Sequence, residues 1–170
     1  MATAIVLENA GLIHKFDPAL EPDEQEFRLL YASDRLRGWL ENDLPAVTSQ
    51  FNIELSPLEQ FDAFVATYAA GLPLIFKRDF KPFTRKPIQS LGDGVWYLKT
   101  QDLRIFGWFW KRDCFIGVVA DTAARCKTYP LYHGYRGEVI RFRDQLDLDE
   151  PKFIASENPD DVILNYDLPT

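Results

Sequence analysis

The stretch from Gly94 to Cys126, GVWYLKTQDLRIFGWFWKRDCFIGVVADTAARC, constrains the fold more than any other part of the sequence. It contains three runs of β-branched, aromatic and large apolar residues, at 95–98, 103–110 and 115–120, which are typical of strands with a buried face. The polar breaks between these runs, at 100–102 and 111–113, are only about three residues long. Connections this short join antiparallel neighbours, so the sequence predicts a three-stranded antiparallel meander as the central sheet.

A capping signal predicts a helix upstream of the meander. Ser56, Pro57 and Glu59 supply an N-cap serine, a proline at the first helical position and a glutamate three residues after the cap. Gly71 and Pro73 predict where the helix ends. The apolar residues of this segment recur at helical spacing and are expected to form one stripe that packs on the sheet: Leu58, Phe61, Phe64, Val65, Tyr68 and Leu72.

Other segments follow simpler patterns. Residues 26–32 alternate in a way that predicts a strand. A helix is expected over residues 35–44, capped by Ser33 or Asp34 and ending before Pro45. Residues 48–55 indicate a loop or a short strand. A second short helix is expected around residues 139–146.

These elements predict an α+β fold, in which two N-terminal helices pack on a small antiparallel meander sheet. A chain of 170 residues with 46% apolar residues can bury one core, so we expect a single domain over residues 26–146. Residues 1–25 are expected to form a loose or peripheral arm, and residues 147–170 an irregular or weakly helical acidic extension.

The sequence also indicates the cellular compartment of the protein. It has no apolar run of membrane-spanning length, and no positively charged leader precedes its first apolar residues. Cys114 and Cys126 are not spaced as a redox pair and are too few for a disulfide framework. We therefore expect a cytoplasmic protein whose cysteines are reduced and lie in or near the core.

Charge is distributed unevenly along the chain. Residues 77–143 hold 14 Lys and Arg against 6 Asp and Glu, whereas the flanking segments hold 5 basic and 20 acidic residues. A basic segment attracts phosphate groups, as in nucleic-acid binding; the alternative is a surface that the acidic flanks neutralise. The densest basic run, 77–86, is predicted to be an ordered loop with Phe80 and Phe83 turned inward. Its candidate RNA-binding residues are Lys77, Arg78, Lys81, Arg85 and Lys86.

Motifs for other chemistries are missing from the sequence. No Cys, His or acidic residues have metal-ligand spacing, and no glycine-rich nucleotide loop or nucleophile elbow occurs, so we expect no metal and no cofactor. A positively charged site on the sheet remains, where cations stabilise charge that develops at a phosphate and a lysine or tyrosine moves protons. The candidate residues are Lys99, Arg104, Arg125 and Lys127 with a nearby tyrosine; for each, the alternative role is a surface ion pair.

The order of these elements resembles the RelE/ParE/HigB superfamily of small bacterial toxins, with the phage-derived HigB-like branch most similar. The run GVWYLKTQDLRIFGWF is similar to the second and third strands of that superfamily, in which a glycine-x-aromatic-x-leucine-basic pattern precedes an arginine that opens the next strand. The resemblance covers about residues 26–143.

The resemblance implies a ribosome-dependent mRNA endoribonuclease that a partner antitoxin holds inactive. In RelE-like members, basic side chains on the sheet bind mRNA phosphates and promote attack by a ribose 2′-OH. Lys99 and Arg104 match the basic residues that close the second strand and open the third. Arg125 or Lys127 matches the basic residue after the last strand, and Tyr129 or Tyr132 matches the late aromatic residue.

Departures from the RelE-like pattern leave two other classes of protein open. Val95 and Tyr97 stand where the ribonuclease members place lysines, and the chain is acidic and nearly twice the usual length. One alternative is a non-catalytic phage or prophage protein that binds a protein partner through the same fold, and the other is a small-molecule enzyme on an unrelated α+β fold. A further hypothesis is that the acidic tail lies across the basic sheet and mimics an antitoxin or a nucleic acid.

Overall fold

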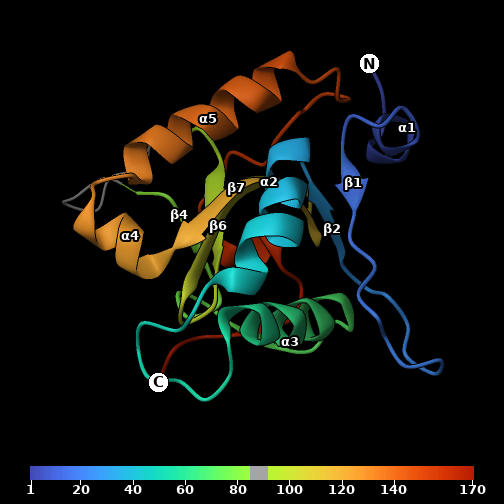
Figure 1. Ribbon diagram of the computed structural model, residues 1–170. Coiled ribbons are helices and arrows are strands. Elements are labelled where there is room, and N and C mark those ends of the chain that lie inside the picture. Colours follow the sequence, from blue (N-terminus) through green and yellow to red (C-terminus); the bar gives the residue numbers. More distant parts are fainter. Residues whose placement is uncertain (85–91) are drawn as a thin grey trace.

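The computed structural model describes residues 1–84 and 92–170, and its centre is a six-stranded sheet in the order β1-β2-β7-β6-β5-β4 (Figure 1). The predicted meander is confirmed: β5 (Val95–Lys99), β6 (Leu103–Lys111) and β7 (Cys114–Thr122) are antiparallel neighbours. The two polar breaks form the connections between them, as their length requires.

The sheet is mixed, so the expectation of a small, purely antiparallel sheet is wrong, although the α+β class is confirmed. β2 (Leu29–Ala32) pairs with β7 in parallel. β1 (His14–Lys15) adds an antiparallel edge beyond β2, and β4 (Phe80–Pro82) forms the other edge beside β5. The parallel pair is possible because a long connection that includes two helices separates β2 from the meander.

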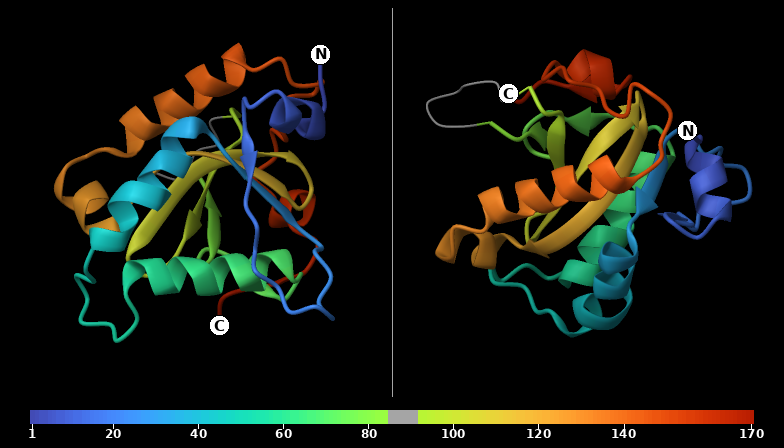
Figure 2. Two further views of the ribbon diagram at one scale, coloured as in Figure 1. Left: turned by 45° about the vertical axis from the view of Figure 1, so that its right-hand side comes forward. Right: turned by 90° about the horizontal axis from the view of Figure 1, so that it is seen from above.

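Helices cover both faces of the sheet (Figures 1 and 2). α2 (Asp34–Gly38) and α3 (Pro57–Ala69) pack on one face. α5 (Tyr132–Gln145) packs on the other face, together with α1 (Ala4–Asn9) near the β1 edge. α4 (Ala123–Thr128), which the sequence analysis did not predict, connects β7 to α5.

Each strand contributes to two cores because successive side chains point to opposite faces. On β6, Ile105 and Phe109 belong to the cluster on the α3 face. Phe106 and Trp108 belong to the cluster on the α5 face. The meander is therefore buried on both sides, which explains why its sequence is almost continuously apolar rather than alternating.

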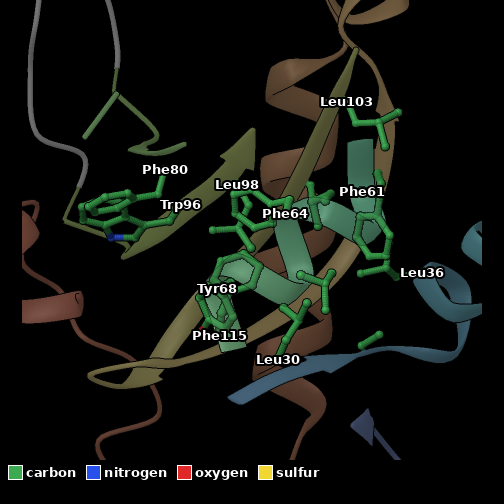
Figure 3. Packing of buried hydrophobic residues seen from close by; sticks show 14 of the residues in the cluster. Leu30, Leu36, Phe61, Phe64, Tyr68, Phe80, Trp96, Leu98, Leu103 and Phe115 are labelled. Carbon is green, nitrogen blue, oxygen red and sulfur yellow. The ribbon is translucent and has the colours of Figure 1, made fainter. Parts of the chain in front are cut away.

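α3 begins as the sequence predicts. Ser56 Oγ accepts a hydrogen bond from the Glu59 amide at 3.2 Å, and the Glu59 carboxylate accepts one from the Ser56 amide at 3.1 Å. The stripe packs on the sheet, with Phe61, Phe64 and Tyr68 in one cluster with Leu98 and Leu103 (Figure 3). Leu72, expected in this stripe, lies beyond the helix end and is exposed.

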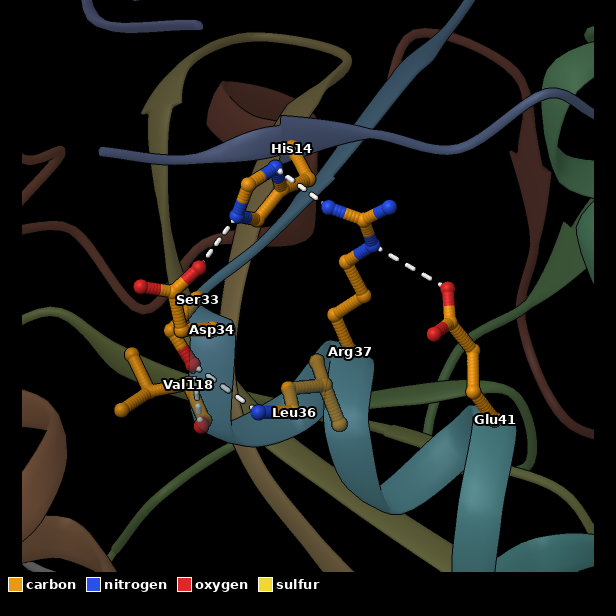
Figure 4. Close-up of polar contacts among 7 residues, drawn as sticks. All are labelled: His14, Ser33, Asp34, Leu36, Arg37, Glu41 and Val118. Carbon is orange, nitrogen blue, oxygen red and sulfur yellow. Dashed lines mark hydrogen bonds and ion pairs between the residues drawn. The ribbon is translucent and has the colours of Figure 1, made fainter. Parts of the chain in front are cut away.

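The first predicted helix is shorter and less regular than expected. Ser33 is the cap, accepting from the Leu36 amide, and its hydroxyl donates to the Val118 carbonyl of β7 (Figure 4). After α2 the chain continues as η1 (Trp39–Asp43), a π-helical turn, and η2 (Leu44–Ala46), a 3-10 turn. Pro45 lies inside η2 rather than after the helix; it has no N–H to continue an α-helical pattern.

Residues 77–86 were expected to form only a loop, but Phe80–Pro82 form edge strand β4. An edge strand tolerates Pro82 because its missing N–H is not needed by a second neighbour. Phe80 and Phe83 are buried, as predicted. Arg85 and Lys86 lie outside the described residues.

Leu148 and Phe153 pack on the α5 face, but no residue of 147–170 lines the pockets formed by Lys99, Arg104 and Lys127, so the tail does not cover these basic side chains as hypothesised. α6 (Pro159–Val162) and Ile163 join the core on the α3 face, and β8 (Tyr166–Asp167) pairs in parallel with β3 (Leu74–Ile75). At the other end of the chain, residues 1–25 supply α1 and edge strand β1.

Two further expectations can be compared with the structure. Cys114 and Cys126 are free thiols, and both are buried in the cluster on the α5 face. Within residues 1–84 and 92–170, no helix has the length and apolar character needed to cross a bilayer.

Candidate functional site

The β5–β6 hairpin brings the two principal candidate residues together. Its register places Lys99 opposite Arg104, and on the other side of β6 Arg104 is opposite Asp121 of β7. Directly opposite residues share a face of the sheet. Because Arg104 alternates with Ile105 and shares its face with Phe106, all three charged residues lie on the α5 face, at the end of the sheet.

Two adjoining pockets of about 590 and 640 Å³ open at this end of the sheet. Both are lined by Lys99, Arg104 and Lys127, and we call them together the basic groove. The remaining lining residues are Phe51, Ile53, Arg78, Asp79, Thr100 and Gln101 on one side, and Lys81, Phe83, Thr84, Tyr97, Tyr132 and His133 on the other. The groove therefore has cations at its centre and an aromatic wall on each side.

Arg104 is fixed at the centre of the groove. It is only 7% exposed, and its Nη1 donates to the carbonyl oxygens of Thr100 at 2.7 Å and Leu103 at 2.8 Å. It also hydrogen-bonds the side chain of Tyr132. These bonds hold the guanidinium in one orientation, so that binding an anion would cost little side-chain entropy.

Of the residues that line the groove, Lys99 has the most strongly shifted pKa. Its ammonium donates to the Lys77 carbonyl at 3.0 Å. Partial burial, followed by the neighbouring charges of Arg104, Lys81 and Lys127, lowers the pKa of Lys99 to about 8. A lysine with this pKa is neutral in an appreciable fraction of molecules near pH 7.5, so it can accept a proton.

Asp102 joins the walls of the groove. Its carboxylate accepts from the Gln50 amide at 3.1 Å and from the Gln60 side chain at 2.6 Å, and its carbonyl accepts from the Ala123 amide. These three bonds connect the loop that carries Phe51, the start of α3, and the start of α4. Asp102 is 2% exposed, so it acts as a buried anchor for this end of the molecule.

The structure separates the candidates that the sequence left open after the last strand. Lys127 of α4 lines the groove, with its Nζ 5.8 Å from the centre of the Phe51 ring. Arg125 points instead toward α2 and bonds the carboxylate of Asp121 at 3.0 Å. Tyr132 lines the groove, whereas Tyr129 is 54% exposed and stacks against Arg125.

Of the described candidate RNA-binding residues, Lys81 and Arg78 line the groove and Lys77 does not. Lys81 lines the aromatic side of the groove. Arg78 lines the other side and is paired with Asp79 at 2.9 Å. Lys77 contributes its backbone carbonyl to Lys99, while its own ammonium lies over the Phe76 ring.

Sequence reasoning missed two residues of the groove. His133 lines the pocket beside Tyr132 and meets Phe83 edge to face, with ring centres 5.6 Å apart. Phe51 is 47% exposed on the opposite wall. His133 directly follows the candidate Tyr132, which was a usable signal, but nothing in the sequence of the 48–55 loop indicated that Phe51 reaches the sheet.

Comparisons with known proteins do not add to this geometry. Neither a family model, nor a curated protein, nor a solved structure matches the chain. Among the residues that the structure describes, no group of three or more His, Cys, Asp or Glu side chains could hold a metal ion.

Proposed function

We propose that this protein is a toxin-like endoribonuclease that cleaves mRNA on the ribosome and is held inactive by a partner antitoxin. The observation that carries the proposal is the basic groove, whose two pockets are both lined by the buried Arg104, the half-buried Lys99 and the exposed Lys127. The order of strand β2, two helices and an antiparallel meander also agrees with the resemblance to RelE-like toxins.

The groove can support cleavage by the RNA's own hydroxyl. The 2′-oxygen attacks the neighbouring phosphorus while its proton passes to the Lys99 amine. The guanidinium of Arg104 and the ammonium of Lys127 stabilise the charge that develops on the phosphate oxygens. The bond from phosphorus to the 5′-oxygen breaks, and the leaving oxygen takes a proton from solvent water. The products are a 2′,3′-cyclic phosphate and a 5′-hydroxyl.

The aromatic walls suit the nucleotides on either side of that phosphate. Bases stack on exposed rings with little sequence preference. The half-buried Tyr132 lies on one side of the central cations, and Phe51, which is 47% exposed, lies on the other; Tyr97 and Phe83 line the Tyr132 side but are buried. A strand bound across the groove would therefore place its phosphate over the cations and its bases against the walls.

The proposal is tested by induced expression in a bacterial host of the wild type and of a Lys99→Ala/Arg104→Ala double variant. We expect the wild type to arrest growth and cleave mRNA, and the double variant to lose at least about a hundredfold in cleavage rate, because both proton transfer and charge stabilisation are removed. The matched control is Lys111→Ala/Arg112→Ala, which removes the same charge at the opposite end of β6 and should remain toxic.

Two single variants show whether the double variant loses activity only because it fails to fold. Lys99 is half-buried and Lys127 exposed, so Lys99→Ala and Lys127→Ala should fold like the wild type and each weaken cleavage. Soluble wild-type protein that leaves growth and mRNA unaffected would contradict the proposal, and so would full toxicity of both single variants and the double variant.

The pH dependence of cleavage should show whether Lys99 is the group that accepts the proton. Lys99 accepts a proton only when neutral, and its pKa is lowered to about 8. The single-turnover rate on ribosome-bound mRNA should therefore rise about tenfold per pH unit below pH 8 and level off above it. In Lys99→Ala the residual rate should lose this rise; a profile that is unchanged would assign the proton transfer to another group.

A second function is favoured by one observation. Val95 and Tyr97, which stand where the ribonuclease members have lysines, are buried in the cluster on the α5 face. A protein with this fold and fewer basic groups is suited to act as a non-catalytic module that binds a protein partner. Salt-dependent RNA binding by the purified protein would favour the endoribonuclease, whereas no RNA binding and no cleavage on ribosomes would favour this alternative.

A further inference from the structure

Three large, exposed apolar residues lie in segments that meet at the C-terminal end of α3. Phe27, Leu72 and Leu164 are 61%, 52% and 68% exposed, and we call them the apolar patch. They come from distant parts of the chain, but their backbones are connected. The Phe27 amide donates to the Ala69 carbonyl at 2.7 Å, and the Asn165 side chain donates to the Gly71 carbonyl at 3.1 Å.

The patch stands on a fixed base. Phe27 lies directly over Gly71, since a Cβ at that glycine would be 2.9 Å from the Phe27 Cβ. Beneath it, the buried guanidinium of Arg28 donates to the carbonyl oxygens of Tyr68 at 3.0 Å and Asn165 at 2.9 Å. The three segments are therefore held together before any partner binds, which favours tight association.

The two chain segments that carry Phe27 and Leu164 are acidic. Residues 17–27, which lead to Phe27, contain five acidic residues and no Lys or Arg. Residues 157–167, which surround Leu164, contain four acidic residues and no Lys or Arg. The exposed carboxylates among these are Asp17, Glu21, Asp23, Glu24, Asp160, Asp161 and Asp167. The β6–β7 hairpin, whose Asp113 accepts from the Leu164 amide, adds the exposed cations Lys111 and Arg112, so acidic side chains outnumber basic ones around the patch and the excess attracts cationic chains.

We propose that the apolar patch is a docking site for a cationic amphipathic segment of a partner protein. Apolar side chains of that segment cover Phe27, Leu72 and Leu164, and its Lys and Arg residues face these two acidic segments. Exposed apolar groups contribute most of the affinity in such a contact, and the charges select the partner and speed association.

This site is separate from the basic groove. The first turn of α3 carries Gln60, which bonds Asp102 at the groove, whereas the apolar patch adjoins the last turn at Ala69, about 14 Å farther along the helix (Figure 1). A partner bound to the patch leaves the groove open, and the inference does not depend on what the groove does.

A synthetic peptide provides the test. The probe is a fluorescent 14-residue helix former with leucine on one face and lysine elsewhere, and its binding to the full chain is measured by anisotropy. We expect Phe27→Ser/Leu72→Ser/Leu164→Ser to weaken binding about tenfold or more. A matched control is Ile5→Ser/Val6→Ser/Leu12→Ser, three apolar residues of α1 and its following turn that are 61%, 53% and 49% exposed; it should bind within about twofold of the wild type.

A second variant keeps all apolar residues and tests the charges. Glu157→Gln/Asp161→Asn/Asp167→Asn should weaken binding of the lysine peptide at low salt, and the difference should shrink at high salt. The inference is overturned if the wild type does not bind the peptide, or if the patch variant binds as tightly as the wild type. It is also overturned if the α1 control loses as much affinity, or if the patch variant abolishes a dimer that light scattering detects in the wild type, since the occupant is then a second copy.

Discussion

Replacing Gly107 by alanine should destabilise the protein by about 3 kcal/mol or more, a large share of the stability expected for a domain of this size. Gly107 lies in β6 where the pairing with β7 shifts register, opposite Gly117. A Cβ there would be 2.1 Å from the Ile116 carbonyl oxygen and 2.8 Å from the Phe115 ring. The nearest atom belongs to the backbone of a central strand, so the two strands would have to separate to make room.

Urea unfolding followed by tryptophan fluorescence measures this loss. Gly117→Ala should cost less, because its Cβ would meet the flexible end of the Leu36 side chain at 2.5 Å rather than backbone. Gly134→Ala is the control: it lies in α5 with nothing within 4 Å of its Cβ and should stabilise the protein by up to about 1 kcal/mol. A Gly107→Ala protein as stable as the wild type would show that the strands are not this close.

Replacing Arg28 by alanine should cost about 3–5 kcal/mol. Arg28 is 2% exposed, and burial lowers the pKa of its guanidinium, which the nearby Asp113 carboxylate at 3.5 Å partly offsets. Its removal takes one of two donors from the carbonyl oxygens of Tyr68 and Asn165, which keep the amides of Gly71 at 3.2 Å and Leu74 at 3.3 Å. It also leaves Asp113 without its charge partner and empties the space that the buried Arg28 side chain fills, and both losses are costly.

The matched control for this prediction is Arg35→Ala. Arg35 is 60% exposed and pairs with Glu138 at the surface, so its removal should cost at most about 1 kcal/mol. The two variants lose the same side chain and differ mainly in burial. If Arg28→Ala cost no more than Arg35→Ala in urea unfolding, the buried guanidinium would not be stabilising the junction of β2, α3 and the C-terminal segment.

Local signals in the sequence were sufficient for the parts of the fold that depend on near neighbours. The polar breaks determined the meander, and the same short hairpin made Lys99 and Arg104 direct neighbours. The capping box at Ser56 predicted the start of α3 because its two hydrogen bonds join residues three positions apart. These features need no knowledge of distant residues.

Features that depend on distant residues were not predictable. Strands β1, β3 and β8 have two residues each, too few for any alternation to be recognised. The parallel pairing of β2 with β7, and the burial of Arg28 against carbonyls from two other segments, depend on contacts that no local pattern encodes.

For the candidate site, the failure to predict α4 had the largest effect, because it left Arg125 and Lys127 as alternatives. Had α4 been predicted from the cap at Thr122, Arg125 and Lys127 could not have been alternatives for the same position. Residues two positions apart in a helix point in nearly opposite directions. That geometry sends Lys127 into the basic groove and Arg125 to Asp121.

The parallel pairing of β2 with β7 has a consequence for how fast the chain folds. The meander joins strands that follow one another directly, whereas β2 must find a partner whose register, Leu29 opposite Cys114, closes a long loop. Loop closure of this length is slow, so we expect the meander to form in the folding transition state and β2 to join afterwards. Substitutions in β5–β7 should then slow refolding, whereas those in β2 should mainly accelerate unfolding.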